Sequence, residues 1–428
     1  MVVIMSAKKR LIVFLVPPQK IVNGGILSIF SICKVSRQFK NIHKSDVMLS
    51  VYPGHKSYKK NDLFDNDEVI HDFDEVVKMG RLESLLVHVP EYASYDVCQE
   101  LKQNYSEYLQ SIPDFRVNIM HQNILLMQPP LEVANWFELT PNLTQTTAHN
   151  RYSDQALADK YAIPVHHLST FVDQNQYKWT PYEKKEKLIT ISLDDAELKE
   201  KVLAKIGHEL PNYKVLIIKN MRYEDYKTTI SRAKFTITFG EGFDGYYVEG
   251  FFTGGIAFAV YNDEFFPDKD FAGFKNTYSN YEEMLVKIVD DMRALDSKPA
   301  YENVVQQNLD KINRLYNFEN YQNNVGDFYK GKYTYLPSTD SIRRLAGLLV
   351  KDRDLQLAEK DATIKDLQQT IAEKDATIKD LQQTIAEKDA TITAKDKEVA
   401  GLLGSKSWKV TKPLRQASAI VKKREVKE

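Results

Sequence analysis

Cysteine and long apolar runs are both scarce in this chain. Its 428 residues include only two cysteines, Cys33 and Cys98. Both stand among apolar neighbours, so we expect two buried free thiols without a disulfide, which fits a reducing cytoplasm. No run of about 18 apolar residues occurs, so no membrane-spanning helix is expected. The apolar stretch before Pro17 and Pro18 lacks a small-residue cleavage site and therefore predicts a first strand and not a signal peptide.

An excess of charge of one sign is missing as well. Lys and Arg number 58 against 59 Asp and Glu, and the net charge of −1 argues against a general nucleic-acid binder. The length exceeds what one hydrophobic core usually serves, so two domains and an extension are expected. We place the domains at residues 1–170 and 171–345, followed by a coiled coil over 346–400 and a basic tail over 401–428.

Both predicted domains alternate short apolar strands with helices. Leu11–Val16 is a continuous apolar run, followed by a turn that contains Gly24 and Gly25 and then by a helix. The second half restarts the alternation with a strand at Lys187–Leu193 and a helix at Ala196–Ile206. This order predicts an α/β protein with two doubly wound, parallel sheets. A Gly-rich loop between a strand and a helix can hold a phosphate or a sugar, although a plain tight turn has the same pattern.

The most informative stretch is Phe235–Asn262, in which two apolar runs flank a Gly-rich turn. Phe235–Phe239 and Ile256–Tyr261 are short and rich in strand-forming residues, so each predicts a buried strand. Between them lie Glu241 and Glu249, separated by seven residues. We expect a helix to begin where the Gly-rich loop ends, so that its unpaired N–H groups could meet a phosphate.

The sequence of this stretch, EGFDGYYVEGFFTGGIAFAV, resembles the nucleotide-sugar site of retaining glycosyltransferases of the GT-B type, whose pattern is similar to EGFGxxxxEAxxxGxxV. The resemblance implies two Rossmann-like domains facing a cleft. It also implies that Glu241 lies near the donor sugar as a catalytic residue and that Glu249 holds the ribose hydroxyls of the nucleotide. The loop around the donor would contain Gly242, Phe243, Asp244 and Gly245. Asp244 stands where the pattern has Gly, and two surface carboxylates are the alternative interpretation.

The predicted strand Phe115–His121 of the first domain ends in a polar residue, His121, and Asn123 follows shortly after it. Open α/β sheets bind ligands at the carboxyl ends of their strands. The resemblance implies that His121 contacts the donor sugar as a second catalytic residue, with Asn123 as a companion. It further implies that the turn at Gly24 and Gly25 faces the cleft. A structural histidine bonded to the backbone is the alternative for His121.

Enzymes of the resembling family carry an Arg and a Lys after the first strand of the second domain, where they hold the donor diphosphate. Here that turn reads Ser192–Asp195 and ends in two acids. Because two phosphates need positive charge, we assign this role to Lys219 and Arg222 after the second strand. Asp-x-Asp triplets at 65–67 and 72–74 could bind a divalent metal. Such triplets are common in acidic loops, so we expect no metal and no cofactor.

From Ala358 the sequence repeats almost perfectly every 14 residues, which is two heptads. Such a sustained spacing without Pro or Gly predicts a left-handed coiled coil, and Ile with Leu favours a dimer while leaving a trimer open. Lys alternates with Leu at the second apolar position and should weaken the association. A single solvated helix of about 65 Å is the alternative. The residues spaced by seven are Leu357, Ile364, Ile371, Ile378, Ile385, Ile392 and Val399.

The last segment, SKSWKVTKPLRQASAIVKKREVKE, has eight Lys or Arg and two Glu. Trp408 and Leu414 are interleaved with basic residues, a combination that suits an anionic membrane surface. The segment resembles the SxSWRxTxPLR ending of many bacterial polysaccharide glycosyltransferases. A disordered basic tail is the alternative.

These features together predict a glycosyltransferase at the cytoplasmic face of the cell membrane. The resemblance implies transfer, with retention, from a nucleotide diphosphate sugar to a surface polysaccharide or a lipid-linked glycan. The expected partners are that donor, the glycan acceptor, a second copy of the chain and an anionic membrane. The alternative is a non-catalytic GT-B-like subunit that binds a glycosyltransferase, because the usual diphosphate clamp is missing. A purely structural coiled-coil tether would explain only the last quarter of the chain.

Overall fold

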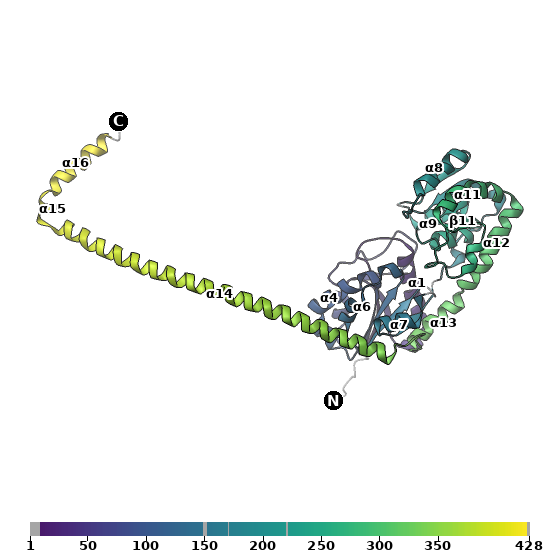
Figure 1. Cartoon of the computed structure of the whole chain (residues 1–428), viewed down its shortest axis with the longest axis horizontal. Coiled ribbons are helices and arrows are strands. Elements are labelled where there is room, and N and C mark those ends of the chain that lie inside the picture. Colours follow the sequence, from purple (N-terminus) through teal and green to yellow (C-terminus); the bar gives the residue numbers. More distant parts are fainter. Residues whose placement is uncertain (1–8, 149–151, 170, 220, 426–428) are drawn as a thin grey trace, which may run out of the picture. The chain divides into compact units, whose positions relative to one another are not determined.

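The computed structural model describes residues 9–148, 152–169, 171–219 and 221–425. The chain divides into two units, residues 1–347 and 348–428 (Figure 1). The expected domain boundary at residue 170 and the last three residues of the expected tail lie outside the described residues.

The first half of unit 1 is built on a seven-stranded parallel sheet with the order β3-β2-β1-β4-β5-β6-β7. The order reverses between β1 and β4, the position where doubly wound sheets open a crevice for ligands. The strands are β1 (Arg10–Val16), β2 (Asp46–Val51), β3 (Ile70–His71), β4 (Ser84–Pro90), β5 (Asp114–His121), β6 (Leu143–Thr147) and β7 (Val165–His167). The helices are α1 (Gly24–Gln38), α2 (Lys40–His43), α3 (Asp74–Lys78), α4 (Ser94–Asn104), α5 (Ser106–Gln110), α6 (Pro130–Ala134) and α7 (Gln155–Tyr161).

The second half of unit 1 holds a five-stranded parallel sheet with the order β12-β11-β10-β8-β9. Its strands are β8 (Glu186–Ile191), β9 (Lys214–Ile217), β10 (Ala233–Ile237), β11 (Ile256–Val260) and β12 (Thr277–Tyr278). Its helices are α8 (Lys199–Glu209), α9 (Tyr223–Arg232), α10 (Gly245–Phe252), α11 (Tyr281–Leu295) and α12 (Lys298–Leu315). The two parallel, doubly wound sheets expected from the sequence are therefore confirmed.

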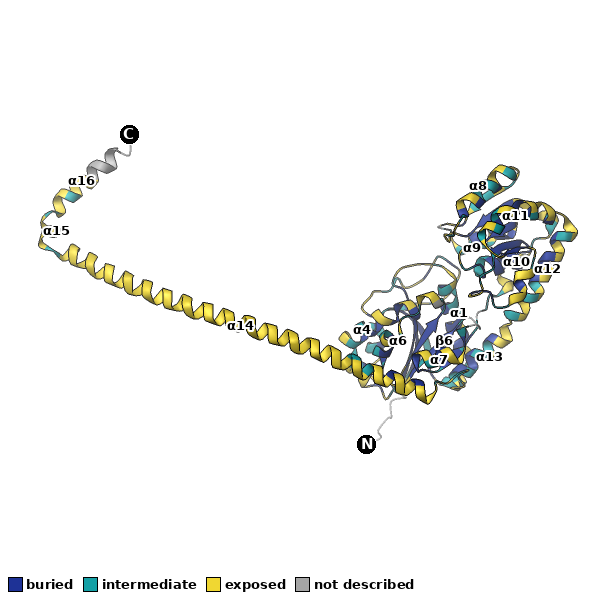
Figure 2. Ribbon diagram, in the orientation of Figure 1, coloured by how far each residue is buried: buried dark blue, intermediate teal, exposed yellow. Residues whose placement is uncertain are grey.

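Alternation along the strands puts side chains on both faces of the first sheet, and both faces are covered. Val13 and Leu15 of β1 join one apolar cluster, whereas Ile12 and Phe14 join another on the opposite face. The second sheet has one large cluster that includes Phe235. Figure 2 shows the strands of both sheets as buried and the outer faces of their helices as exposed. Burial on both faces explains why the strands are continuous apolar runs.

After the second sheet the chain returns to the first. Helix α13 (Phe318–Tyr329) packs against α1, and the hydroxyl of Tyr329 donates to Oγ of Ser36 at 2.7 Å. A Cβ on Gly326 would lie 2.7 Å from the ring of Phe39, so only glycine allows this close approach. The return ties the second half of the chain to the first sheet.

A single helix, α14 (Thr339–Gly404), runs through the repeats and is followed by α15 (Lys406–Val410) and α16 (Lys412–Glu425). The seven apolar residues spaced by seven are each 50% to 59% exposed, and Figure 2 shows this helix as almost wholly exposed. A stripe of exposed Ile and Leu at this spacing is what a coiled coil would cover. Of the described helices, none is both long and apolar enough to cross a bilayer.

We expect the chain to self-associate through this stripe. Replacing Ile371 and Ile385 by Asn puts polar groups at two positions that a partner helix would bury, so the assembly should dissociate to monomer. Sedimentation-velocity measurements would report the change in mass.

Gln369→Asn with Gln383→Asn is the matched control, because these positions point away from the stripe. An oligomer that survives the isoleucine changes, or a parent that is already monomeric, would contradict the expectation.

Candidate functional site

The loop after β10 carries the first glutamate of the motif, and its backbone depends on glycine. Gly240 and Gly242 have φ of +75° and +79°, which side chains with a Cβ rarely adopt. A Cβ on Gly242 would also collide with the carbonyl oxygen of Val260 at the end of β11. The two glycines thus fold the chain sharply between β10 and α10 and direct Glu241 towards the first sheet.

Glu241 is hydrogen-bonded to the first half of the chain. Nδ2 of Asn123, just after β5, donates to Oε1 of Glu241 at 2.8 Å. Burial, together with the charge of Asp194, raises the pKa of Glu241 to about 6. The contact joins the carboxyl edges of the two sheets and brings together two residues that the sequence assigned to one site.

Glu91, which the sequence interpretation did not select, completes this network. Its Oε1 accepts the backbone N–H of Asn123 at 2.8 Å, and its Oε2 has no hydrogen-bond partner among the described residues. Glu91 is 1% exposed, and burial raises its pKa to about 7. It directly follows β4 at the reversal of strand order. The rule that selected Asn123, a polar residue at the end of a strand, would also have selected Glu91.

His121 lies buried at the end of β5, with 5% of its surface exposed. Nε2 shares a hydrogen bond of 2.9 Å with Oε1 of Gln145. Burial lowers the pKa of His121 to about 4, so the ring is neutral at neutral pH. Because Gln145 offers a carbonyl oxygen, we assign the proton to Nε2, which leaves Nδ1 as an acceptor. Nδ1 has no hydrogen-bond partner within the described part of the chain.

The turn with Gly24 and Gly25 forms the start of α1. Nε2 of Gln122 donates to the carbonyl oxygen of Gly25 at 2.9 Å. A Cβ on Gly25 would lie only 2.9 Å from Oε1 of Gln122. Asn23 caps the helix by accepting the N–H of Ile26 at 2.9 Å. Glycine at 25 therefore lets the turn pack directly against the end of β5.

The N-terminus of α10, expected to be open to a phosphate, is capped by the protein itself. Oδ1 of Asp244 accepts the N–H of Tyr247 at 3.0 Å, and Oδ2 accepts the hydroxyl of Thr238 at 2.7 Å. Burial raises the pKa of Asp244 to about 7. A carboxylate at an N-cap is favourable, and it accounts for Asp at a position where the resembling pattern has Gly.

Glu249, the second glutamate of the motif, lies inside a cluster of tyrosines. It is 6% exposed, and Oε1 accepts the hydroxyl of Tyr223 at 2.8 Å. The hydroxyl of Tyr177 is hydrogen-bonded to that of Tyr223. Burial raises the pKa of Glu249, and the hydrogen bonds from tyrosine hydroxyls oppose this effect. One carboxylate oxygen is thus already engaged.

The basic side chains near the site differ in their exposure and in the groups that they contact. Lys219 and Arg222, assigned to the diphosphate, are exposed between β9 and α9. Lys199 is buried instead, and Nζ donates to the carbonyl oxygens of Ser192, Leu193 and Asp194 at 3.1, 3.1 and 2.6 Å. Lys199 therefore fixes the turn after β8, where the resembling enzymes carry their clamp, with its ammonium turned to the backbone.

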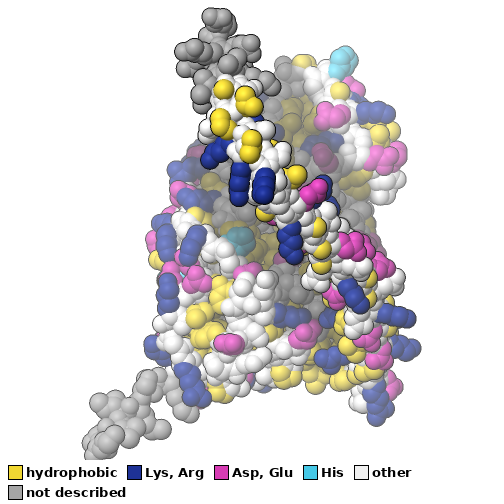
Figure 3. Space-filling model, turned by 90° about the vertical axis from the view of Figure 1, so that its left-hand side faces the viewer, with side chains coloured by type: hydrophobic (Ala, Val, Ile, Leu, Met, Phe, Trp, Pro, Cys, Tyr) yellow, Lys and Arg dark blue, Asp and Glu magenta, His cyan; other side chains and the backbone are white. Residues whose placement is uncertain are grey.

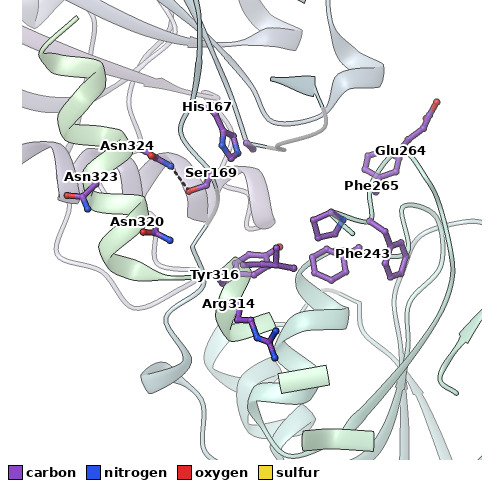
Figure 4. A pocket seen from close by; sticks show the side chains of 14 residues that line it. His167, Ser169, Phe243, Glu264, Phe265, Arg314, Tyr316, Asn320, Asn323 and Asn324 are labelled. Carbon is purple, nitrogen blue, oxygen red and sulfur yellow. Dashed lines mark hydrogen bonds between the residues drawn. The ribbon is translucent and has the colours of Figure 1, made fainter. Parts of the chain in front are cut away.

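A cavity of about 350 Å³ adjoins the Gly-rich loop (Figure 4). It is lined by Phe243 from that loop, by Ser169 after β7, and by Tyr316 and Asn320 near the junction of α12 and α13. Nδ2 of Asn324 lies 3.5 Å from Oγ of Ser169, the contact drawn in Figure 4. A small hollow lined by His121 shares Ala148 and Ser169 with this cavity. Aromatic rings and amide groups therefore meet in one concave surface.

Comparison with known proteins agrees on the fold. No family model and no curated protein matches the chain. Sucrose-phosphate synthase from Thermosynechococcus elongatus aligns with a TM-score of 0.50 and 10% identity over 76% of this chain and 99% of its own. The HepE protein of Anabaena, in complex with UDP and glucose, aligns with a TM-score of 0.47 and 8% identity over 75% and 100%. The chain has the GT-B fold, as expected from the motif.

The buried carboxyl of Glu91 makes stability depend on pH. The pKa of Glu91 is about 7 in the folded protein, above that of an ordinary carboxyl near 4.5. Between these values the folded state binds more protons than the unfolded state, so the free energy of unfolding falls as pH rises. We expect Glu91→Gln to remove this part of the slope and to stabilise the protein at pH 8 by about 2–3 kcal/mol relative to the parent.

Urea unfolding of both proteins at pH 5 and pH 8 would measure the difference. Equal stability differences between parent and variant at the two pH values would contradict the raised pKa.

Proposed function

We propose that the protein is a glycosyltransferase that takes its sugar from a nucleotide diphosphate sugar. The proposal rests on one observation above all: the first glutamate of the motif meets Asn123 of the opposite sheet at 2.8 Å. A donor sugar held there would touch groups from both halves of the chain, which is how a two-lobed transferase excludes water from the reaction. The GT-B fold is consistent with this function but does not decide it.

Each group in the site has a chemical task under this proposal. Glu241 would orient the donor sugar and stabilise positive charge that develops at its anomeric carbon. Glu249 would bind the ribose hydroxyls. Neutral His121 would accept a hydrogen bond from a sugar hydroxyl at Nδ1. The leaving diphosphate would assist the incoming hydroxyl on the same face of the sugar, which gives retention without a protein nucleophile.

The acceptor would bind in the cavity beside Phe243. Its aromatic and amide lining suits the apolar faces and the hydroxyl groups of a sugar ring. The volume of about 350 Å³ lies within the ordinary range of small-molecule sites. We propose a surface polysaccharide or a lipid-linked glycan as the acceptor class, because the C-terminal segment suits a membrane surface.

That segment would hold the enzyme at an anionic membrane. Trp408 and Val410 of α15 are 40% and 76% exposed, and Leu414 of α16 is 73% exposed. The guanidinium of Arg415 stacks 3.4 Å from the centre of the Trp408 ring. Figure 3 shows hydrophobic and basic side chains together on the segment nearest the viewer. Exposed apolar side chains beside Lys and Arg are what interfacial helices present to lipid.

A non-catalytic GT-B-like subunit remains the second candidate. The turn after β8 offers the diphosphate no cation among its described side chains. The ammonium of Lys199 is turned to the backbone, and the turn itself carries the acid Asp194. Burial, with the charge of Asp194, raises the pKa values of Glu241 and Asp244, and these acids in their charged form would repel phosphate. A protein of this kind would recognise a glycosyltransferase partner without turning over a donor.

Binding and turnover separate the two candidates. We expect one nucleoside diphosphate among UDP, GDP, dTDP, CDP and ADP to raise the melting temperature of the parent. Glu249→Ala should weaken its binding about 10- to 100-fold through the lost ribose hydrogen bonds. Glu241→Ala should leave binding intact and lower hydrolysis of the matching nucleotide sugar about 10²- to 10³-fold.

Glu302→Ala is the control, since Glu302 is an exposed carboxylate on α12 and is not part of the motif. If no nucleotide binds, the transferase proposal fails. If nucleotide binds but no donor is turned over by the parent, the non-catalytic candidate is favoured.

The tail is tested with lipid vesicles. We expect the full chain to sediment with phosphatidylglycerol vesicles and not with phosphatidylcholine vesicles. Replacing Lys406, Lys409 and Lys412 by Gln should weaken sedimentation about 100-fold, because each basic residue near an anionic surface contributes about 1 kcal/mol. Binding that ignores both the lipid charge and these substitutions would contradict a membrane role for the tail.

A further inference from the structure

A tyrosine hydroxyl occupies the position where the proposed function places a ribose hydroxyl. Tyr223 is the first residue of α9, and its hydroxyl donates to Oε1 of Glu249 at 2.8 Å. The hydroxyl of Tyr177 is hydrogen-bonded to Tyr223 from its other side. A ribose offers two neighbouring hydroxyls to a carboxylate, so a ribose bound to both carboxylate oxygens would compete with Tyr223 for Oε1.

The ring of Tyr223 is held in this position by its neighbours. It stacks on Tyr226 with ring centres 5.6 Å apart and planes at 27°. Nζ of Lys227 lies 5.2 Å from the ring centre, within range of a cation–π interaction. The hydroxyl therefore reaches Glu249 from a fixed ring and not from a freely rotating side chain.

Tyr223 also contacts the first half of the chain. Its backbone N–H donates to the carbonyl oxygen of Leu63 at 2.9 Å, in the segment between β2 and β3. Its ring packs at the edge of the cluster that covers one face of the first sheet. Tyr223 thus connects the segment between β2 and β3 with the carboxylate of Glu249, which is proposed to hold the ribose.

Gly245 lies beside the carboxylate of Glu249. A Cβ on Gly245, one turn earlier in α10, would lie 3.4 Å from Oε1 of Glu249. Because Gly245 has no side chain, it adds no side-chain cover to the carboxylate. Glu249 as a whole is only 6% exposed, and the hydroxyl of Tyr223 contacts its Oε1.

We propose that Tyr223 is an internal occupant of the ribose site, and that a nucleotide binds by displacing its hydroxyl from Glu249. The inference rests on the proposed function, since it assumes that Glu249 receives the ribose. Displacement exchanges one hydrogen bond to the carboxylate for another, so part of the binding energy of the nucleotide is spent on releasing Tyr223. The hydroxyl of Tyr223 consequently sets the affinity of the site.

The test is nucleotide affinity in Tyr223→Phe, which keeps the ring and removes only the competing hydroxyl. Isothermal titration with UDP, GDP, dTDP, CDP and ADP should show about tenfold tighter binding of the preferred nucleotide to this variant than to the parent. A structural role for the hydroxyl predicts the opposite sign, because a damaged site binds more weakly.

Tyr213→Phe is the matched control. Its hydroxyl also donates to a carboxylate, Oδ2 of Asp296 at 2.7 Å, but Tyr213 lies before β9 at the amino edge of the sheet. We expect unchanged affinity in this control. In a Glu249→Ala background, adding Tyr223→Phe should give no gain, because the two groups act on the same oxygen.

The outcomes separate this inference from the proposed function on which it rests. If the parent binds a nucleotide and Tyr223→Phe binds it equally or more weakly, the inference is overturned while the proposed function stands. If Tyr223→Phe binds a nucleotide that the parent does not, both are supported. If neither protein binds any of the five nucleotides, both are rejected.

Discussion

The candidate site depends on one contact between the two parallel sheets, the hydrogen bond of 2.8 Å from Asn123 to Glu241. This bond closes the carboxyl edge of the second sheet against that of the first and buries a carboxyl group in the process. Its donor is held in turn by Glu91 through the backbone N–H of Asn123. Three polar residues, which follow β4, β5 and β10 in the chain, therefore form a single network, and the position of each depends on the others.

Burial gives this network an unusual electrostatic character. The pKa values of Glu241, Glu91 and Asp244 are raised to about 6, 7 and 7, chiefly because burial disfavours the charged form. At neutral pH the site consequently carries less negative charge than three fully ionised carboxylates would. Under the proposed function, a diphosphate approaching the site would meet partly protonated carboxyl groups, which would lessen the repulsion that an Arg and a Lys would otherwise have to balance.

Local patterns in the sequence were sufficient to predict the fold and about half of the candidate site. Apolar runs marked the strands, and the glutamate pair marked the loop and helix that carry Glu241 and Glu249. The remaining features arise between segments far apart in the chain. Tyr223 reaches Glu249 from another helix, and Glu91 is selected only once β4 and β5 are known to be neighbours. Asp244 as the cap of α10 was within reach of the sequence, because Asp is a preferred N-cap residue.

The central claim is that a nucleotide sugar binds where the carboxyl edges of the two sheets meet. Hydrogen–deuterium exchange with and without the nucleoside diphosphate tests it directly, since the amides of residues 240–249 would line the bound ligand. The account predicts slower exchange in this segment and in the segment around Asn123, with no change along the repeats. Slower exchange elsewhere, with the 240–249 amides unaffected, would contradict it.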